Sequence, residues 1–65
     1  MCYCVHWYVF EAGDIRDLMG ERFFKSLKKA TEFARTQAED GIRVFVSELE
    51  SRTSEDTGRV VLAIG

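Results

Sequence analysis

The sequence has no proline, only two cysteines and no long hydrophobic run. Because no apolar stretch approaches the ~20 residues of a membrane-spanning helix, we expect no membrane segment. The first ten residues lack the charged region and the small-residue cleavage site of a signal peptide. Two cysteines, Cys2 and Cys4, are too few for the disulfide framework of a small secreted domain. We therefore expect a cytoplasmic protein with reduced thiols.

The chain also lacks a strong excess of charge of either sign. Nine basic and eleven acidic residues leave a net charge of −2, which excludes a strongly cationic nucleic-acid-binding domain. Of the 65 residues, 46% are hydrophobic and 31% are charged, a balance that argues against disorder. We expect a single domain, residues 1–65. Folding a chain of this length buries only ~60% of its unfolded surface, so it needs a compact core or a partner.

The glycines are scattered, and no two of them have the G-x-G spacing of a phosphate-binding loop. No pair of carboxylates is compelled to share an enclosed site. A chain this small also has little room for a pocket of ~300 Å³. We therefore expect no enzymatic activity, no cofactor and no small-molecule substrate.

Cys2, Cys4 and His6 share one face of the first predicted strand, which makes them the candidates for metal ligation or thiol catalysis. Cys2 and His6 lie roughly 13 Å apart along an extended strand, whereas zinc needs its ligands within ~2.3 Å. His6 is close enough to touch Cys4, but neither an oxyanion device nor a glycine elbow accompanies them. We favour the simpler interpretation of buried thiols beside a partly buried imidazole, and expect no metal.

Four segments have clear patterns, which predict the order strand, helix, strand, strand. Residues 3–10 are rich in β-branched and aromatic side chains, residues 42–49 alternate cleanly, and residues 59–64 are short and apolar. A polar turn region, residues 50–58, separates the last two strands. The helix is predicted over residues 26–40, with Ser26 as N-cap and Gly41 as the C′ residue. Its apolar stripe recurs at helical spacing: Leu27, Ala30, Ala34 and Ala38.

Residues 11–25 are predicted to form a long connection. Within it, Asp14 fits the N-cap of a short helical turn that places Ile15, Leu18 and Met19 inward. A connection of this length is either functional or covers an edge or face of the sheet. We favour the covering role.

The predicted fold class is α+β, a β-α-β-β two-layer domain with a three-stranded sheet and one main helix on one face. The last two strands form an antiparallel hairpin. The first strand is either parallel to residues 42–49 or antiparallel to residues 59–64. One helix covers one face only, so the other exposes apolar side chains that include His6, Tyr8, Phe10, Phe45, Leu49, Val61 and Ala63, or the set around Trp7 if the faces are reversed. The long connection, a second copy or a partner would cover this patch.

Charge is distributed unevenly along the chain. Residues 11–21 hold four acidic residues and one basic residue, a net −3. Residues 22–35 hold five basic residues and one acidic residue, a net +4. Residues 36–65 hold six acidic and three basic residues, a net −3. The helix is therefore basic, and the loops and the final hairpin are acidic.

Two functional interpretations follow from this pattern, beside the simpler one of a solvated mixed-charge surface. In the first, acidic side chains face a cationic groove on another protein. These candidates are Glu48, Glu50, Glu55, Asp56, Asp14 and Asp17. In the second, the basic helix lies on phosphates. Those candidates are Lys25, Lys28, Lys29 and Arg35. We favour the acidic interpretation because aromatic residues are not interleaved with the helix lysines.

The size and layout of the chain resemble those of small phage-encoded proteins, among them anti-CRISPR proteins. The segments that carry the resemblance are FFKSLKKATEFART, IRVFVSELES and GRVVLAIG. The resemblance implies a non-enzymatic inhibitor, in the host cell cytoplasm, that binds a bacterial CRISPR effector complex and blocks its DNA binding through an acidic surface. A net charge of −2 favours a local acidic patch over mimicry of DNA by the whole surface.

Two alternatives remain beside this inhibitor. One is a small nucleic-acid-binding protein that uses the basic helix. The other is a homodimeric regulatory module that buries the second sheet face around Tyr8 and Phe45. No motif assigns a role to any individual residue.

Overall fold

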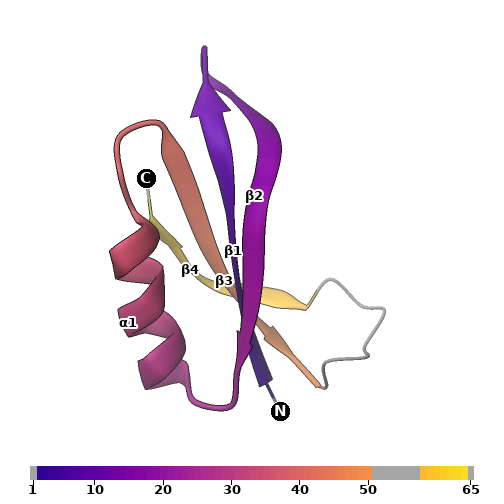
Figure 1. The fold of residues 1–65 in the computed structure, drawn as a ribbon. Coiled ribbons are helices and arrows are strands. Elements are labelled where there is room, and N and C mark those ends of the chain that lie inside the picture. The colour runs from indigo at the N-terminus through magenta and orange to yellow at the C-terminus, as the bar shows by residue number, and fades with distance from the viewer. Residues whose placement is uncertain (1, 51–57, 65) are drawn as a thin grey trace.

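The structure, a computed structural model, describes residues 2–50 and 58–64. Its elements are β1 (Cys2–Glu11), β2 (Asp14–Phe24), α1 (Leu27–Gln37), β3 (Ile42–Leu49) and β4 (Arg59–Ile64). The strands form one antiparallel sheet in the order β2-β1-β3-β4, and α1 packs on one face of it (Figure 1). The predicted α+β class is confirmed, but the sheet has four strands rather than three.

The additional strand is β2, which occupies the segment predicted as a long connection with a helical turn. Ala12 and Gly13 join it to β1, and both residues have positive φ, 55° and 79°. Positive φ at both central residues is typical of a type I′ turn, whose twist matches that of a hairpin. Two register shifts between Trp7 and Phe10 mark bulges or similar irregularities in this hairpin. Each shift interrupts the two-residue alternation, so the sequence of β2 lacks a recognisable strand pattern.

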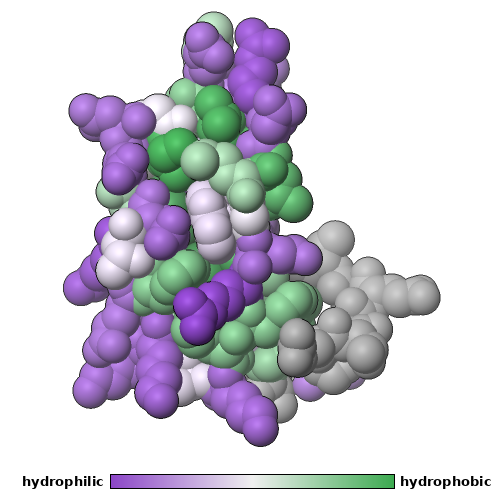
Figure 2. Space-filling model, in the orientation of Figure 1, coloured by the Kyte–Doolittle hydropathy of each residue, from purple (hydrophilic) through white to green (hydrophobic). Residues whose placement is uncertain are grey.

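The side chains that the helical turn was expected to bury are exposed. Ile15 is 43% exposed, Leu18 is 52% exposed and Met19 is 53% exposed. In Figure 2, hydrophobic side chains gather where the hairpin extends past α1, and hydrophilic ones cover the outer side of the helix. The prediction of inward-facing side chains was therefore wrong.

The position of β1 also differs from both predicted arrangements. β1 lies beside β3 and runs antiparallel to it. The physical reason is the unpredicted strand: β2 reverses the chain before the helix, so the chain returns after α1 in the direction opposite to β1. The predicted antiparallel hairpin of the last two strands is confirmed by the pairing of β3 with β4.

The helix begins where it was predicted and ends earlier. The Ser26 hydroxyl accepts a hydrogen bond from the Lys29 backbone N–H at 3.4 Å, which confirms the N-cap. The last helical residue is Gln37, and Gly41 lies beyond the helix, in the turn that enters β3. Gly41 has a φ of 81°, which glycine adopts without steric cost. The residue therefore serves this turn, not the helix end.

The core between α1 and the sheet is small. Its fully buried members are Val5, Val44 and Val46 from the sheet and Ala30 and Ala34 from the helix. The alanines have little side chain, so the helix axis approaches the sheet closely. These five residues share the faces that the strand alternation and the helical stripe predicted.

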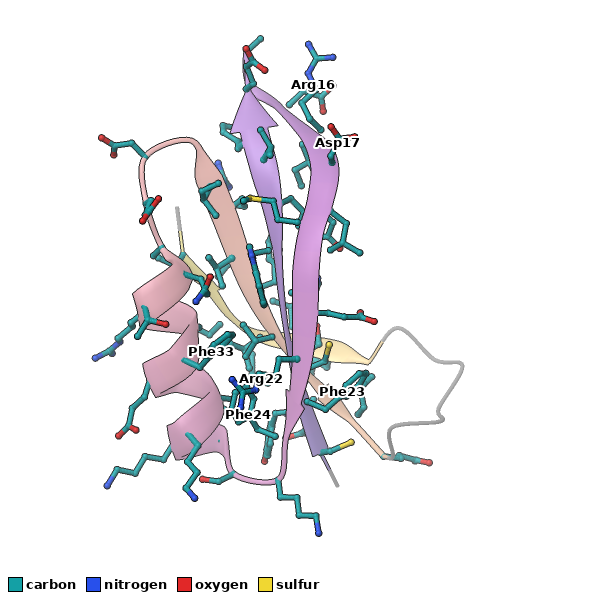
Figure 3. The ribbon with its side chains drawn as sticks, in the orientation of Figure 1. Arg16, Asp17, Arg22, Phe23, Phe24 and Phe33 are labelled. Carbon is teal, nitrogen blue, oxygen red and sulfur yellow. The ribbon has the colours of Figure 1, made fainter. Side chains whose placement is uncertain are left out.

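Larger rings close this layer around the valines. The Phe33 ring lies 5.4 Å from the rings of both Trp7 and Phe24, centroid to centroid. Arg22 places its guanidinium carbon 5.3 Å from the Phe24 ring centroid and 5.2 Å from that of Phe33. In Figure 3, Arg22, Phe24 and Phe33 lie between β2 and α1, whereas Phe23 points away from the helix.

In β4, a register shift beside Val46 and Ser47 exchanges the predicted faces of two valines. Val60 pairs with Ser47 on the side away from the helix and is 53% exposed. Val61 packs against the core instead of lying on the second face. The described residues contain no helix with the length and hydrophobicity needed to cross a membrane.

Candidate functional site: the uncovered face of the sheet

The side of the sheet opposite α1 carries aromatic and aliphatic side chains, and no helix or strand of the described residues lies over it. Strand alternation and the pairing register define its members. We call this set the open sheet face: Cys2, Cys4, His6, Tyr8, Phe10, Ile15, Leu18, Glu21, Phe23, Arg43, Phe45, Ser47, Leu49, Val60 and Ala63. Six of the seven residues predicted for the second face therefore lie on it, whereas Val61 does not.

Exposure changes along this face. At the end where β1 begins, Cys2, Cys4 and Ser47 are buried. Toward the hairpin, Ile15 and Leu18 are among the most exposed large hydrophobic side chains of the described residues. Val60 on the edge strand β4, which pairs with Ser47, is 53% exposed. The accessible parts of the open sheet face therefore lie toward the turn between β1 and β2 and along the edge strand β4.

His6 lies at the centre of the face, where it is the middle member of three hydrogen-bonded side chains. Its Nδ1 lies 2.9 Å from the Tyr8 hydroxyl, and its Nε2 lies 3.0 Å from the Ser47 hydroxyl. The Phe45 ring stacks on the imidazole at a centroid distance of 5.5 Å. A hydroxyl can donate or accept, so both nitrogens are satisfied in either neutral tautomer.

The surroundings of His6 and Cys4 favour their neutral forms. Burial lowers the pKa of His6 below its usual 6.5, and the nearby Glu21 carboxylate opposes this shift with a smaller effect. Burial also raises the pKa of the Cys4 thiol above its usual 9.0, to which the Glu21 and Cys2 charges add. A backbone hydrogen bond at Arg22 acts in the opposite direction. At neutral pH the thiol is therefore protonated and a poor nucleophile.

Two charged side chains belong to the open sheet face, one on each side of β1. Glu21 on β2 pairs with His6 in the sheet register, and Arg43 on β3 pairs with Tyr8. The Arg43 guanidinium carbon lies 4.1 Å from the Phe10 ring centroid. Its buried Nε has no hydrogen-bond partner among the described residues. The guanidinium of Arg43 thus lies over the Phe10 ring while its Nε donor is unused.

The acidic residues singled out from the sequence do not form one surface within the described residues. Glu48 forms an ion pair with Arg59, with 3.5 Å between Glu48 Oε1 and Arg59 Nη2. Glu50 is exposed just beyond β3. Asp14 and Asp17 lie in β2 at the hairpin end. The two groups lie toward opposite ends of the ten-residue strand β1, which is roughly 30 Å long at the usual strand rise. Glu55 and Asp56 fall outside the described residues.

The basic candidates lie together on the helix side of the molecule. Lys28, Lys29 and Arg35 are exposed on α1, and Lys25 is exposed immediately before the N-cap. They therefore lie on the layer opposite the open sheet face.

Sequence reasoning missed the two hydroxyl partners of His6. Tyr8 was placed on the correct strand face, but its contact with His6 was not predicted. Ser47 is only 4% exposed, and the one signal for it is a lone hydroxyl residue within an apolar strand. Within the described parts of the chain, no three His, Cys, Asp or Glu side chains gather closely enough to hold a metal ion.

Comparisons with known proteins identify no relative. No protein-family model, no curated protein and no solved structure matches the chain. Function must therefore be argued from the residues alone.

Proposed function

We propose that this protein is a non-catalytic protein-binding module and that the open sheet face is its contact surface. The observation that carries the proposal is the exposure of Ile15, Leu18 and Val60, at 43%, 52% and 53%, on a face with no described element over it. Apolar patches with a polar rim are typical of protein interfaces. Asp14 and Asp17 in β2 supply such a rim at the hairpin end.

The chemistry of His6 supports binding over catalysis. A Ser–His pair is a familiar arrangement for nucleophilic catalysis, but Ser47 is only 4% exposed, so a substrate has little access to its hydroxyl. The imidazole already has a hydroxyl partner at each nitrogen. This network satisfies polar groups beneath an apolar surface, a role suited to a rigid interface.

The test compares capture of binding partners by the wild type and by surface variants. Immobilised wild type, Leu18→Glu and Val60→Glu are exposed to bacterial lysate, and the bound proteins are identified. Leu27→Glu is the matched control, because Leu27 is 43% exposed and lies on α1. We expect a protein, a further copy of this chain included, that the wild type and the control retain and both open-face variants lose. Capture that is absent, or that ignores both open-face substitutions, contradicts the proposal.

A more specific candidate within this class is the anti-CRISPR-like inhibitor. The exposure of Asp14, Asp17 and Glu50 favours it, because accessible carboxylates can occupy a DNA-binding groove. The assay is DNA binding by purified CRISPR effector complexes in the presence of the protein. We expect inhibition that weakens when Asp14 and Asp17 are both replaced by lysine; no inhibition by the wild type rejects this candidate.

A nucleic-acid-binding function is the second candidate, favoured by the cations on and beside α1. A gel shift at low salt tests it. Binding that is lost on replacing Lys28 and Lys29 by glutamate supports it, and no shift at low salt rejects it.

A further inference from the structure

We propose that the partner of the open sheet face is a second copy of this chain, joined to the first in a two-fold symmetric dimer with face against face. This inference rests on the proposed function, since it names the occupant of the same surface.

The size of the molecule supports a second copy. Among the described residues, the largest fully buried side chains are three valines, Val5, Val44 and Val46. Chains of this length bury a small share of their surface and commonly gain stability from association. The two longer extents of the molecule, 34 and 23 Å, set an upper limit of roughly 800 Å² for such a face, which is close to the area that each partner buries in an interface of standard size.

The charges on the face are self-complementary. Glu21 and Arg43 lie on opposite sides of β1, at neighbouring positions along it. A two-fold axis that runs along β1, within the interface, places β2 of one copy over β3 of the other. Each Glu21 then lies over the strand that carries the partner copy's arginine. The interface would contain two such pairs of opposite charge, each an arginine and a carboxylate.

The opposite choice of axis is less favourable. An axis within the interface but across the strands places β2 over β2, and the two copies of Glu21 approach each other. Like charges that meet in an interface destabilise it. The same two residues argue against nucleic acid on this face, because one cation beside one carboxylate gives phosphates no net attraction.

Sedimentation velocity over a concentration series measures the dimer, and a charge exchange tests its geometry. The variants are Glu21→Arg, Arg43→Glu and the double variant that carries both changes. Lys29→Glu, on the exposed side of α1, is the control for a change of the same size and sign as Arg43→Glu. Circular dichroism confirms that each variant retains the fold.

We expect a species of twice the 7.5 kDa chain mass in the wild type and in the control. Each single exchange should raise the dissociation constant about tenfold or more, and the double exchange should restore most of the affinity. A monomer at every concentration overturns the inference. A dimer that is indifferent to both single exchanges, or that the double exchange fails to restore, also overturns it.

These outcomes are distinct from failure of the proposed function. If the protein stays monomeric in sedimentation but captures another protein through Leu18 and Val60, the proposed function stands and only the dimer is rejected. If the protein neither dimerises nor captures another protein, both the dimer and the proposed function are rejected.

Discussion

At the residue scale, His6 is the least ordinary side chain of the molecule. It is half-buried between Tyr8, Ser47 and Phe45, and its neutral form satisfies every polar atom of the three-residue chain. The sequence placed His6 and Tyr8 on one strand face, because alternation is a local property. It placed Ser47 on one strand face with Phe45, but it did not predict the contact of Ser47 with His6, because that contact depends on the register between β1 and β3.

Acid should destabilise the protein through His6. Its folded-state pKa is below the unfolded value of 6.5, so the unfolded chain binds more protons as the pH falls through that value. The contribution of His6 to the free energy of unfolding should therefore be constant above about pH 7 and decrease from about pH 6.5 downward. Urea denaturation at a series of pH values measures it, with His6→Gln as the control that loses this dependence. An equally steep decrease in His6→Gln would contradict the assignment.

Gly20 should tolerate no side chain, because Trp7 packs against it. A Cβ at this position would lie 2.7 Å from Trp7 Cζ2, closer than real contacts allow. We expect Gly20→Ala to displace the indole and to cost about 1–3 kcal/mol of stability. Trp7 is the only tryptophan, so its fluorescence in a urea titration reports both effects. An unchanged emission maximum and midpoint would show that the indole does not depend on this glycine.

At the element scale, the sequence predicted the elements whose signals are local and missed the one whose signals are not. The alanine stripe and the Ser26 cap specify α1 within one short segment. β3 and β4 have the composition of strands, and their bounds were predicted correctly. β2 has bulges and a turn that requires positive φ at Ala12, a residue that rarely adopts it. Neither feature can be recognised in a single sequence.

Replacing Ala12 should stabilise the hairpin. Ala12→Asn creates an Asn-Gly pair, the preferred sequence of a type I′ turn, and relieves the cost of positive φ at alanine. We expect a gain of about 0.5–1 kcal/mol in the free energy of unfolding. Asp40→Asn, at an exposed turn position outside this hairpin, is the control for the introduction of an asparagine alone. A loss of stability in Ala12→Asn would contradict the turn assignment.

At the scale of the whole molecule, one helix and four strands make a two-layer domain with one face uncovered by the described elements. The sequence predicted that such a face would exist, because a single amphipathic helix covers only one side of a sheet. The role predicted for residues 11–25 was wrong, because the segment expected to cover the sheet instead joins the sheet as strand β2. The exposure of Leu18 and Met19 follows directly from that difference.

Association through this face should make thermal stability depend on concentration. A dimer is favoured by mass action, so the midpoint temperature should rise between about 10 μM and about 1 mM protein. Differential scanning calorimetry measures this rise, and Leu18→Glu should abolish it. A midpoint independent of concentration in the wild type would contradict association in this range.

The most direct test of the central claim, that two copies of the chain meet through the open sheet face, is a dilution series followed by two-dimensional ¹H–¹⁵N NMR. We predict that dilution shifts the amide signals of His6, Leu18 and Phe45 and leaves those of Lys28 and Arg35 on α1 unchanged. Shifts confined to α1, or a spectrum that is identical at every concentration, would contradict association of two copies through this face.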